Sequence, residues 1–141
     1  MSFVNIAQQK QVVSFKQAVL SPIGENRGIY FPQHIKKLDS DVLASKDFNT
    51  IAIETLYNLT SGELSKEQLE GMVSRAFNFP VKVHSLEPKQ HVLELFHGPT
   101  LAFKDFGARF LAECMAHFNK EKSTIVTATS GDTGAAVAHA F

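Results

Sequence analysis

Apolar residues recur at helical spacing in the middle of the chain. Within residues 47–60 and 65–77 they follow one another at intervals of three and four, which predicts two amphipathic helices. Ser65 is followed three positions later by Gln68, and this capping-box pattern marks the start of the second helix. Neither helix carries a cluster of catalytic residue types, so we expect both to serve packing.

The pattern differs on either side of residue 80. Before it, residues 14–20 read as a short helix or strand, and residues 28–32 read as a short buried strand closed by its proline. We therefore expect a mainly helical N-terminal subdomain over residues 1–80. Residues 81–141 are expected to begin an α/β cofactor-binding domain.

The second part alternates between strand and helix patterns. Short apolar runs at 81–83 and 91–96 predict strands, and a helical stripe extends from 103 to 118. A buried strand is expected at 123–128, and the turn 130–134 leads into a last helix. This alternation is typical of an α/β fold, a parallel sheet with crossover helices. Ligands bind such sheets at the carboxyl ends of the strands, where both polar turns are expected to lie.

Composition narrows the classes of function. The 141 residues predict one domain by length, and 14 basic residues balance 14 acidic ones. This balance argues against a nucleic-acid arm or a polybasic membrane surface, which need clustered positive charge. The single cysteine, Cys114, excludes an internal disulfide and a multi-cysteine zinc site. With no apolar run near 20 residues and no secretory signal pattern, a cytoplasmic protein is expected.

The chain ends in an apolar run without a helix stop signal. The last helix pattern continues to Phe141 with no glycine, proline or polar cap. We interpret the chain as cut inside a helix, and hence as a portion of a larger protein. A parallel sheet with missing strands and helices would expose apolar surface, so self-association or partial disorder is expected of these residues alone.

A lysine interrupts the apolar stretch that follows the turn 97–100. Lys104 lies near the predicted helix start, where the positive potential disfavours an ammonium group, and flanking Phe103 and Phe106 exclude water. Both effects favour a neutral amine that can capture a carbonyl group as a Schiff base. The alternative is a surface lysine whose stem covers aromatic rings.

Neighbours of this lysine have simpler expected roles. Asp105 complements the helix N-terminus, and Thr100 caps the helix. His97 is interpreted as a hydrogen-bonded turn residue, with a weaker case for an acid or base. Gly98 shapes the turn, and Gly107 allows another group to approach the helix.

A second polar turn, Thr129-Ser-Gly-Asp-Thr-Gly134, follows the last predicted strand and opens the last helix. Free backbone N–H groups at a helix start bind carboxylate or phosphate, and the hydroxyl groups of Ser130 and Thr133 add donors. Gly131 and Gly134 permit close approach of a ligand. Asp132 repels an anion unless it caps the helix or faces another group, and a capped turn without ligand is the alternative reading.

Other catalytic patterns are missing from the sequence. It contains no dinucleotide fingerprint, no P-loop and no nucleophile elbow. The six histidines show no pairing at metal-ligand spacing, so no metal site is predicted.

The two turns together resemble the threonine synthase family. The matching segments are 97–109 and 127–134, and the opening runs 14–20 and 28–32 also resemble that family, so the likeness spans almost the whole chain. The resemblance implies the N-terminal portion of a pyridoxal-phosphate enzyme of fold type II, the tryptophan-synthase-β-like fold. It implies that O-phospho-L-homoserine and water are converted to L-threonine and phosphate.

The resemblance also implies roles for individual residues. Lys104 binds pyridoxal phosphate covalently and moves protons during the reaction, and Phe103 and Asp132 contact the cofactor. Thr100 and the second turn help to hold the substrate, through Ser130, Gly131, Thr133 and Gly134. In related enzymes an asparagine often occupies the position of Asp132 and contacts the hydroxyl group of the cofactor ring.

One departure from the family pattern limits the expectation. The family holds the cofactor phosphate with a glycine-rich loop much later in the chain, and these 141 residues contain none. We therefore expect them to need the remainder of the chain for turnover. A related pyridoxal-phosphate lyase, such as a phospholyase or a dehydratase-like enzyme, and a non-catalytic interaction module stay open as alternatives.

Overall fold

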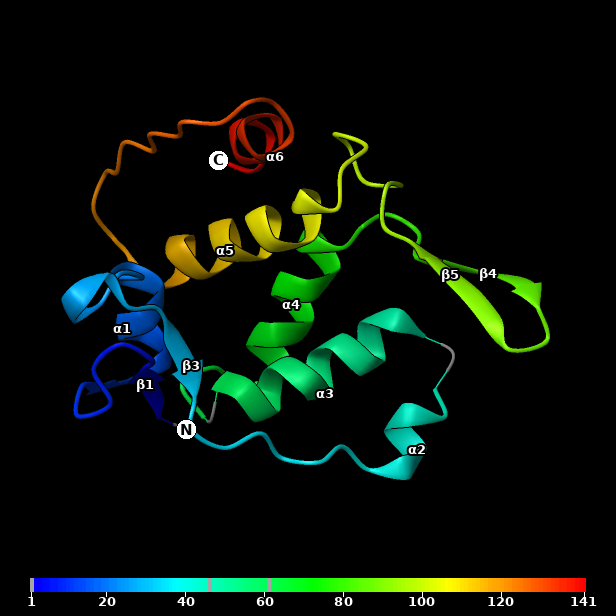
Figure 1. Cartoon of the computed structure of the whole chain (residues 1–141), viewed down its shortest axis with the longest axis horizontal. Helices are drawn as coiled ribbons and strands as arrows, with labels where there is room; N and C mark the ends of the chain where they lie inside the picture. The colour runs from blue at the N-terminus through cyan, green and yellow to red at the C-terminus, as the bar shows by residue number, and fades with distance from the viewer. Residues whose placement is uncertain (1, 46, 61) are drawn as a thin grey trace.

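The structure is a computed structural model that describes residues 2–45, 47–60 and 62–141 (Figure 1). Helices dominate, and the strands are short. In chain order the elements are β1 (Phe3–Asn5), β2 (Val12–Val13), α1 (Phe15–Leu20), the 3-10 helix η1 (Glu25–Arg27), β3 (Tyr30–Pro32), α2 (Ser40–Leu43), α3 (Phe48–Thr60), α4 (Lys66–Ala76), β4 (Lys82–Glu87), β5 (Gln90–Glu94), α5 (Lys104–Phe118) and α6 (Asp132–Ala140).

The N-terminal strands form a small antiparallel sheet in the order β2-β1-β3. The buried Asn5 side chain organises it, accepting hydrogen bonds from the backbone of Ala7 and Gln8 and donating to Gln11. The predicted strand at 28–32 is confirmed over Tyr30–Pro32. Its predicted burial is wrong, because this small sheet leaves Phe31 54% exposed.

Both predicted middle helices are present as α3 and α4. The capping box of α4 forms as expected, with the Ser65 hydroxyl accepting from the Gln68 backbone and the Gln68 side chain accepting from the Ser65 backbone. An equivalent box at Ser14 and Gln17 starts α1, so residues 14–20 adopt the helical alternative. These predictions are confirmed because the residues of each capping box lie within one helical turn of one another.

The core lies where α4 packs between α3 and α5 (Figure 1). Leu64, Leu69 and Met72 are almost fully buried there, and partly buried side chains surround them: Phe15, Ile53, Leu56, Phe110 and Phe118. The aromatic residues continue this core in edge-to-face contacts, and Phe106 lies against the rings of Phe48 and Phe79.

Helix α5 forms where the apolar helical pattern of residues 103–118 predicted it, but these apolar residues lie on two faces of the helix and not on one. Phe106, Phe110 and Cys114 point to the core side. Phe103 is 58% exposed and Leu111 is 41% exposed, since both border a groove that faces α6. Burial raises the pKa of the Cys114 thiol to about 12, so this cysteine is an inert part of the packing.

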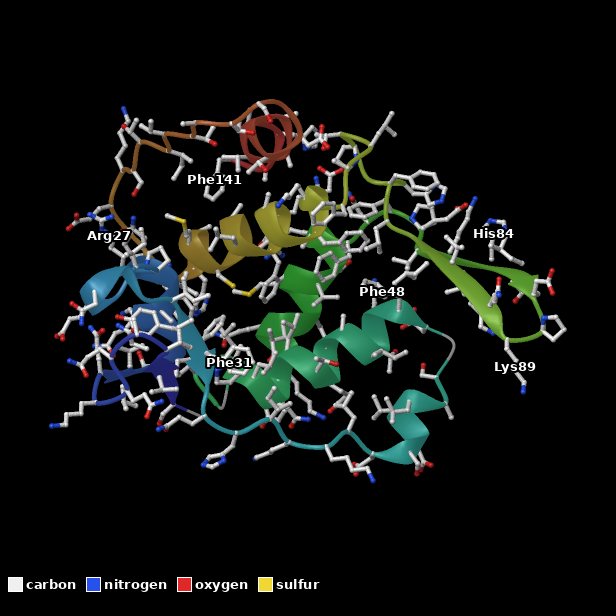
Figure 2. All side chains as sticks on the ribbon, in the orientation of Figure 1. Arg27, Phe31, Phe48, His84, Lys89 and Phe141 are labelled. Atoms are coloured by element: carbon white, nitrogen blue, oxygen red, sulfur yellow. The ribbon has the colours of Figure 1, made fainter. Side chains whose placement is uncertain are left out.

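Strands β4 and β5 do not form a parallel pair among the described residues. They pair with each other in an antiparallel hairpin that extends away from the helices, with His84 and Lys89 along it (Figure 2). The ladder bonds of residues 91–94 are thus made to the preceding strand. The described residues contain no parallel strand pair.

The predicted buried strand at 123–128 is also not formed. These residues are extended but exposed, and they pair with no described strand. Val126 is 87% exposed. A strand needs a partner for its backbone groups, and the described part of the chain supplies none for this segment.

The described residues therefore form a mixed fold of helices and short strands, compatible with the α/β class. None of the described helices is long and apolar enough to cross a membrane.

Arg109 connects α5 to the end of α4. Its guanidinium donates to the backbone oxygens of Arg75 and Ala76, at 2.6 Å each, and to Oδ1 of Asn78 at 3.0 Å. The two backbone oxygens belong to the last turn of α4, where no helical N–H follows to bond them. A cation at that end also stabilises the helix dipole.

We expect Arg109→Met to lower the free energy of unfolding of the intact protein by roughly 2 kcal/mol, because carbonyl groups lose a charged donor while the aliphatic packing is kept. Urea unfolding monitored by circular dichroism measures the change. Arg75→Ala, which breaks the exposed pair with Glu113, serves as control and should cost at most about 1 kcal/mol. Equal stability of Arg109→Met and the wild type would contradict the capping role.

Candidate functional site around Lys104

Lys104 is the first residue of α5, which agrees with its predicted position near the helix start. Its side chain is half-buried, and Nζ lies 4.7 Å from the centre of the Phe103 ring. This distance is within the range of a cation–π contact. The ring beside the amine is itself 58% exposed, so the amine lies at the edge of the packed structure.

A groove of about 520 Å³, lined in part by Lys104, lies between α5 and α6. We call it the Lys104 groove; its lining residues are Leu95, Phe103, Lys104, Phe106, Gly107, Ala108, Leu111, Thr133 and Val137. No described atom lies within 4 Å of a Cβ built on Gly107, which leaves the floor open at that point. The groove is mainly apolar with few polar groups, as ligand sites commonly are.

The Lys104 groove joins the two turns that the sequence singled out. Thr133, from the first turn of α6, lines it together with Lys104 and Phe103. Ser130, Gly131 and Asp132 are exposed beside it but do not line it. The structure thus brings one member of the second turn directly to the lysine.

The second turn is built around Thr129. Its Oγ1 accepts a hydrogen bond from the Gly131 backbone at 3.2 Å, and a Cβ at Gly134 would lie 2.4 Å from its methyl carbon. Gly134 is therefore required for close packing within the turn. Helix α6 begins at Asp132, and no side chain caps it. Asp132 does not cap the helix, so its exposed carboxylate adds charge complementarity in the first turn.

The turn before Lys104 corrects one prediction. Thr100 does not cap α5, because the N-cap position belongs to Phe103 and no side chain bonds to it. Instead, Asp105 accepts two hydrogen bonds from Thr100, from its backbone N–H at 2.9 Å and from its hydroxyl at 2.6 Å. Asp105 is fully buried. Its place in the first turn of α5 agrees with the predicted complement to the helix dipole.

His97 is the hydrogen-bonded turn residue that the sequence favoured. Its Nε2 lies 2.6 Å from Oε2 of Glu94, and Nε2 of His84 lies 3.4 Å from the other oxygen. The hydrogen bond with His97 lowers the pKa of Glu94, and burial raises it by less. The pKa of Glu94 therefore lies below its ordinary value of 4.5. Sequence reasoning missed Glu94, which ends β5. Its spacing of three from His97 was the available signal.

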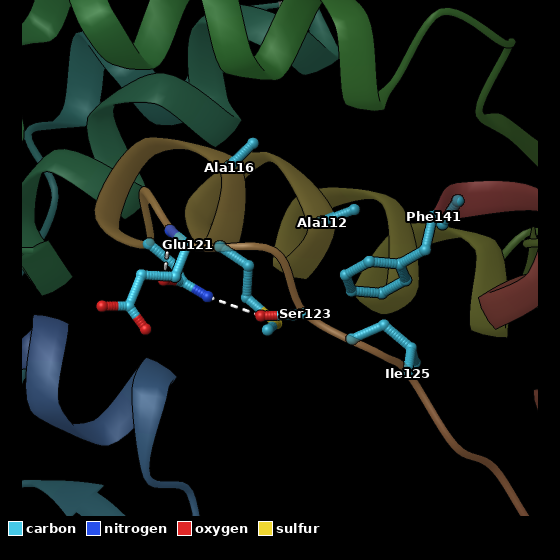
Figure 3. A pocket seen from close by; sticks show the side chains of 9 residues that line it. Ala112, Ala116, Glu121, Ser123, Ile125 and Phe141 are labelled. Atoms are coloured by element: carbon cyan, nitrogen blue, oxygen red, sulfur yellow. Dashed lines mark hydrogen bonds between the residues drawn. The ribbon is translucent and has the colours of Figure 1, made fainter.

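A second hollow lies further along α5, toward its C-terminal end. It holds about 270 Å³ between α5, the segment after it and the end of α6. Figure 3 shows Ala112 and Ala116 on its helix wall, with Ile125 and Phe141 at one end. Asn119 donates a hydrogen bond to Ser123 at the other end. The side chains that line the hollow do not form a cluster of titratable or nucleophilic groups. Among the described residues, no three metal-ligating side chains converge on a metal position.

Comparison with known proteins places these features in context. A family model described as the threonine synthase N terminus matches residues 2–77. Threonine synthase from Escherichia coli (strain K12) is 46% identical over 145 residues, which cover all of this chain and 34% of the relative. Threonine synthase from Haemophilus influenzae is also 46% identical, with the same coverage.

Solved structures agree with this similarity. The crystal structure of threonine synthase from Escherichia coli matches with a TM-score of 0.91 and 45% identity, covering the whole chain and 34% of that protein. The PLP-bound threonine synthase from Brucella melitensis matches with a TM-score of 0.91 and 35% identity, over 33% of its length. The chain thus spans about a third of the length of these relatives.

The lowered pKa of Glu94 predicts a pH-dependent contribution to stability. A carboxyl group whose pKa is lower in the folded state stabilises the fold above its ordinary pKa, and this stabilisation is lost as the pH falls through the folded value. Glu94→Gln should therefore reduce the free energy of unfolding at neutral pH, and the deficit should shrink below pH 4.5.

Urea unfolding of the intact protein at a series of pH values measures this difference. Glu87→Gln, in the same hairpin but outside the described histidine contacts, is the control and should follow the wild type. A deficit in Glu94→Gln that stays constant across the acidic range would contradict the assignment.

Proposed function

The chain belongs to the threonine synthase family, and we propose that it supplies the lysine and part of the substrate site of a pyridoxal-phosphate-dependent threonine synthase. The single observation that carries the proposal is the Lys104 groove, in which the amine and the first turn of α6 meet. The proposed activity belongs to the whole protein, because the chain spans about a third of its relatives.

The Lys104 groove fits an aromatic aldehyde cofactor. Its walls are mainly apolar, the Phe103 ring lies beside the amine, and Gly107 leaves space over the helix. Lys104 and Phe103 would hold pyridoxal phosphate, with Asp132 close by. When bound, this cofactor supplies an aldehyde that reacts with an amine and a ring that withdraws electrons from the attached substrate.

Lys104 has two tasks in the proposed reaction. Its Nζ binds the cofactor aldehyde in the resting enzyme and, once the substrate amine has displaced it, holds a proton that it returns to a substrate carbon. A position at the start of a helix orients the amine while leaving its stem free to move. The Phe103 ring shields one side of the amine from water.

The first turn of α6 would bind the substrate carboxylate. Unbonded backbone N–H groups at a helix start attract an anion, and Thr133 lines the groove at this point. Ser130 adds a hydroxyl donor, while Gly131 and Gly134 keep the approach free of side chains. The proposed substrate is O-phospho-L-homoserine, which with water yields L-threonine and phosphate.

We also propose the division of the chain. Residues 1–80 form the mainly helical subdomain and residues 81–141 begin the cofactor-binding domain; the family match over 2–77 supports the boundary. The exposed, apolar extended segment 123–128 is proposed to join a parallel sheet with strands from the remainder of the protein, which supports the fold-type-II assignment.

The role of Lys104 is tested by trapping. Borohydride reduction of the intact protein with pyridoxal phosphate, followed by peptide mass spectrometry, should locate the cofactor on Lys104. Lys104→Ala should lose both this label and phosphate release from O-phospho-L-homoserine, whereas Lys122→Ala should keep both. A label on another lysine, or turnover in Lys104→Ala, would refute the proposal. Faster turnover of serine or threonine would favour the related lyases.

Strand formation at 123–128 is tested by amide hydrogen exchange. In the intact protein we expect the amides around Ile125 and Val126 to exchange slowly, because ladder bonds protect them. The exposed loop 34–37 provides an internal reference that should exchange fast. Equally fast exchange in both segments would show that no strand forms.

A further inference from the structure

Asp105 is a charged group in an unusual position. Its carboxylate is fully buried at the start of α5, one residue after Lys104, and both hydrogen bonds that the structure gives it come from Thr100. Burial of a charge is costly unless the charge is well bonded. The α5 dipole and two donors from one residue compensate for that cost here.

The direction of these bonds restricts what Thr100 can do. A carboxylate accepts only, so the hydroxyl of Thr100 donates its proton to Oδ1 of Asp105. Toward any ligand, this hydroxyl can then offer only lone pairs. It cannot act as a donor to the carboxylate or phosphate of a substrate while the bond persists.

The backbone around these bonds is tightly constrained. A Cβ on Gly98 would lie 2.4 Å from Oδ2 of Asp105, so only glycine allows the turn to pass over the carboxylate. Leu101 has a φ of 58°, a left-handed conformation that is unfavourable for a branched side chain, and its side chain is 74% exposed. The exposed side chain of Leu101 therefore does not stabilise this conformation. The hydrogen bonds of Thr100 before it and the burial of Ala102 after it hold the backbone of Leu101 at positive φ.

From this geometry we infer that Asp105 is a positioning residue for Lys104, and that Thr100 acts through Asp105 instead of binding substrate. The two side chains form a clasp, defined here as Thr100 and Asp105, that closes the turn 98–103 against the first turn of α5. Closure fixes the direction in which Phe103 and Lys104 leave the backbone and enter the groove. The inference rests on the proposed function and deepens it.

The test uses the intact protein and four variants. Thr100→Val removes the hydroxyl and keeps the shape and the backbone N–H, while Thr100→Ser keeps the hydroxyl and removes the methyl group. Asp105→Ala removes the acceptor. Glu113→Ala removes another acid of α5, one that pairs with Arg75 on the surface, and serves as control.

Two measurements are made on each variant, and the KM for O-phospho-L-homoserine is measured in addition on Thr100→Val. Amide hydrogen exchange of residues 98–105 without cofactor reports the clasp itself. The rate at which pyridoxal phosphate becomes borohydride-fixed on Lys104 reports the position of the amine. Thr100→Val and Asp105→Ala should exchange faster in this turn and attach cofactor roughly 10²-fold more slowly, as expected when a reacting group is displaced. Thr100→Ser and Glu113→Ala should match the wild type.

The outcomes separate the inference from the proposed function. Absence of a Lys104 label in the wild type refutes the proposed function, and the exchange data then still judge the clasp. Wild-type attachment rates in Thr100→Val overturn the inference even if Asp105→Ala fails to fold. So does a Thr100→Ser variant as slow as Thr100→Val. A raised KM for O-phospho-L-homoserine with unchanged attachment in Thr100→Val would make Thr100 a substrate ligand and overturn the inference.

Discussion

The packing of α5 against α4 determines where the reactive amine lies. Phe106 and Phe110 of α5 enter the aromatic core, and Arg109 bonds to the last carbonyl groups of α4. The opposite face of α5 carries small residues and packs on α6. A helix held on both sides behaves as a rigid rod, so the position of its first residue follows from contacts made along its whole length.

The N-terminal end of α5 holds two functional groups side by side. The positive end of the helix dipole stabilises the buried carboxylate of Asp105, and the Lys104 amine lies over the Phe103 ring at the same helix end. Adjacent residues of a helix point in different directions, so the carboxylate turns inward to Thr100 while the amine reaches the groove. The tight turn with Leu101 at positive φ is the structural consequence of bringing both groups to one helix end.

Local patterns predicted the helices well, and long-range pairing poorly. The capping box at Ser65 and the start of α5 at Lys104 depend on residues within one turn, which the sequence contains completely. The predicted parallel pairing is not present among the described residues for the opposite reason. Residues 91–94 pair with the preceding strand of their hairpin, and residues 123–128 have no described strand beside them. The alternation of strand and helix patterns along the sequence does not indicate which strands pair. The prediction of a Thr100 cap was wrong because α5 begins later, with Phe103 at the N-cap position, and the Thr100 hydroxyl instead donates to the buried carboxylate of Asp105.

Residue chemistry and local order were readable from the chain alone: a lysine at a helix start, a glycine-bearing turn before another helix, and aromatic residues around both. Their meeting in one groove was decided by tertiary structure, because Lys104 and Thr133 belong to different helices and touch the same space only through the packing of α5 on α6. The approach of His84 and His97 to Glu94 likewise depended on the hairpin register. Local propensities act over a few residues, whereas contacts between distant segments follow from the shapes of buried surfaces, which no short pattern encodes.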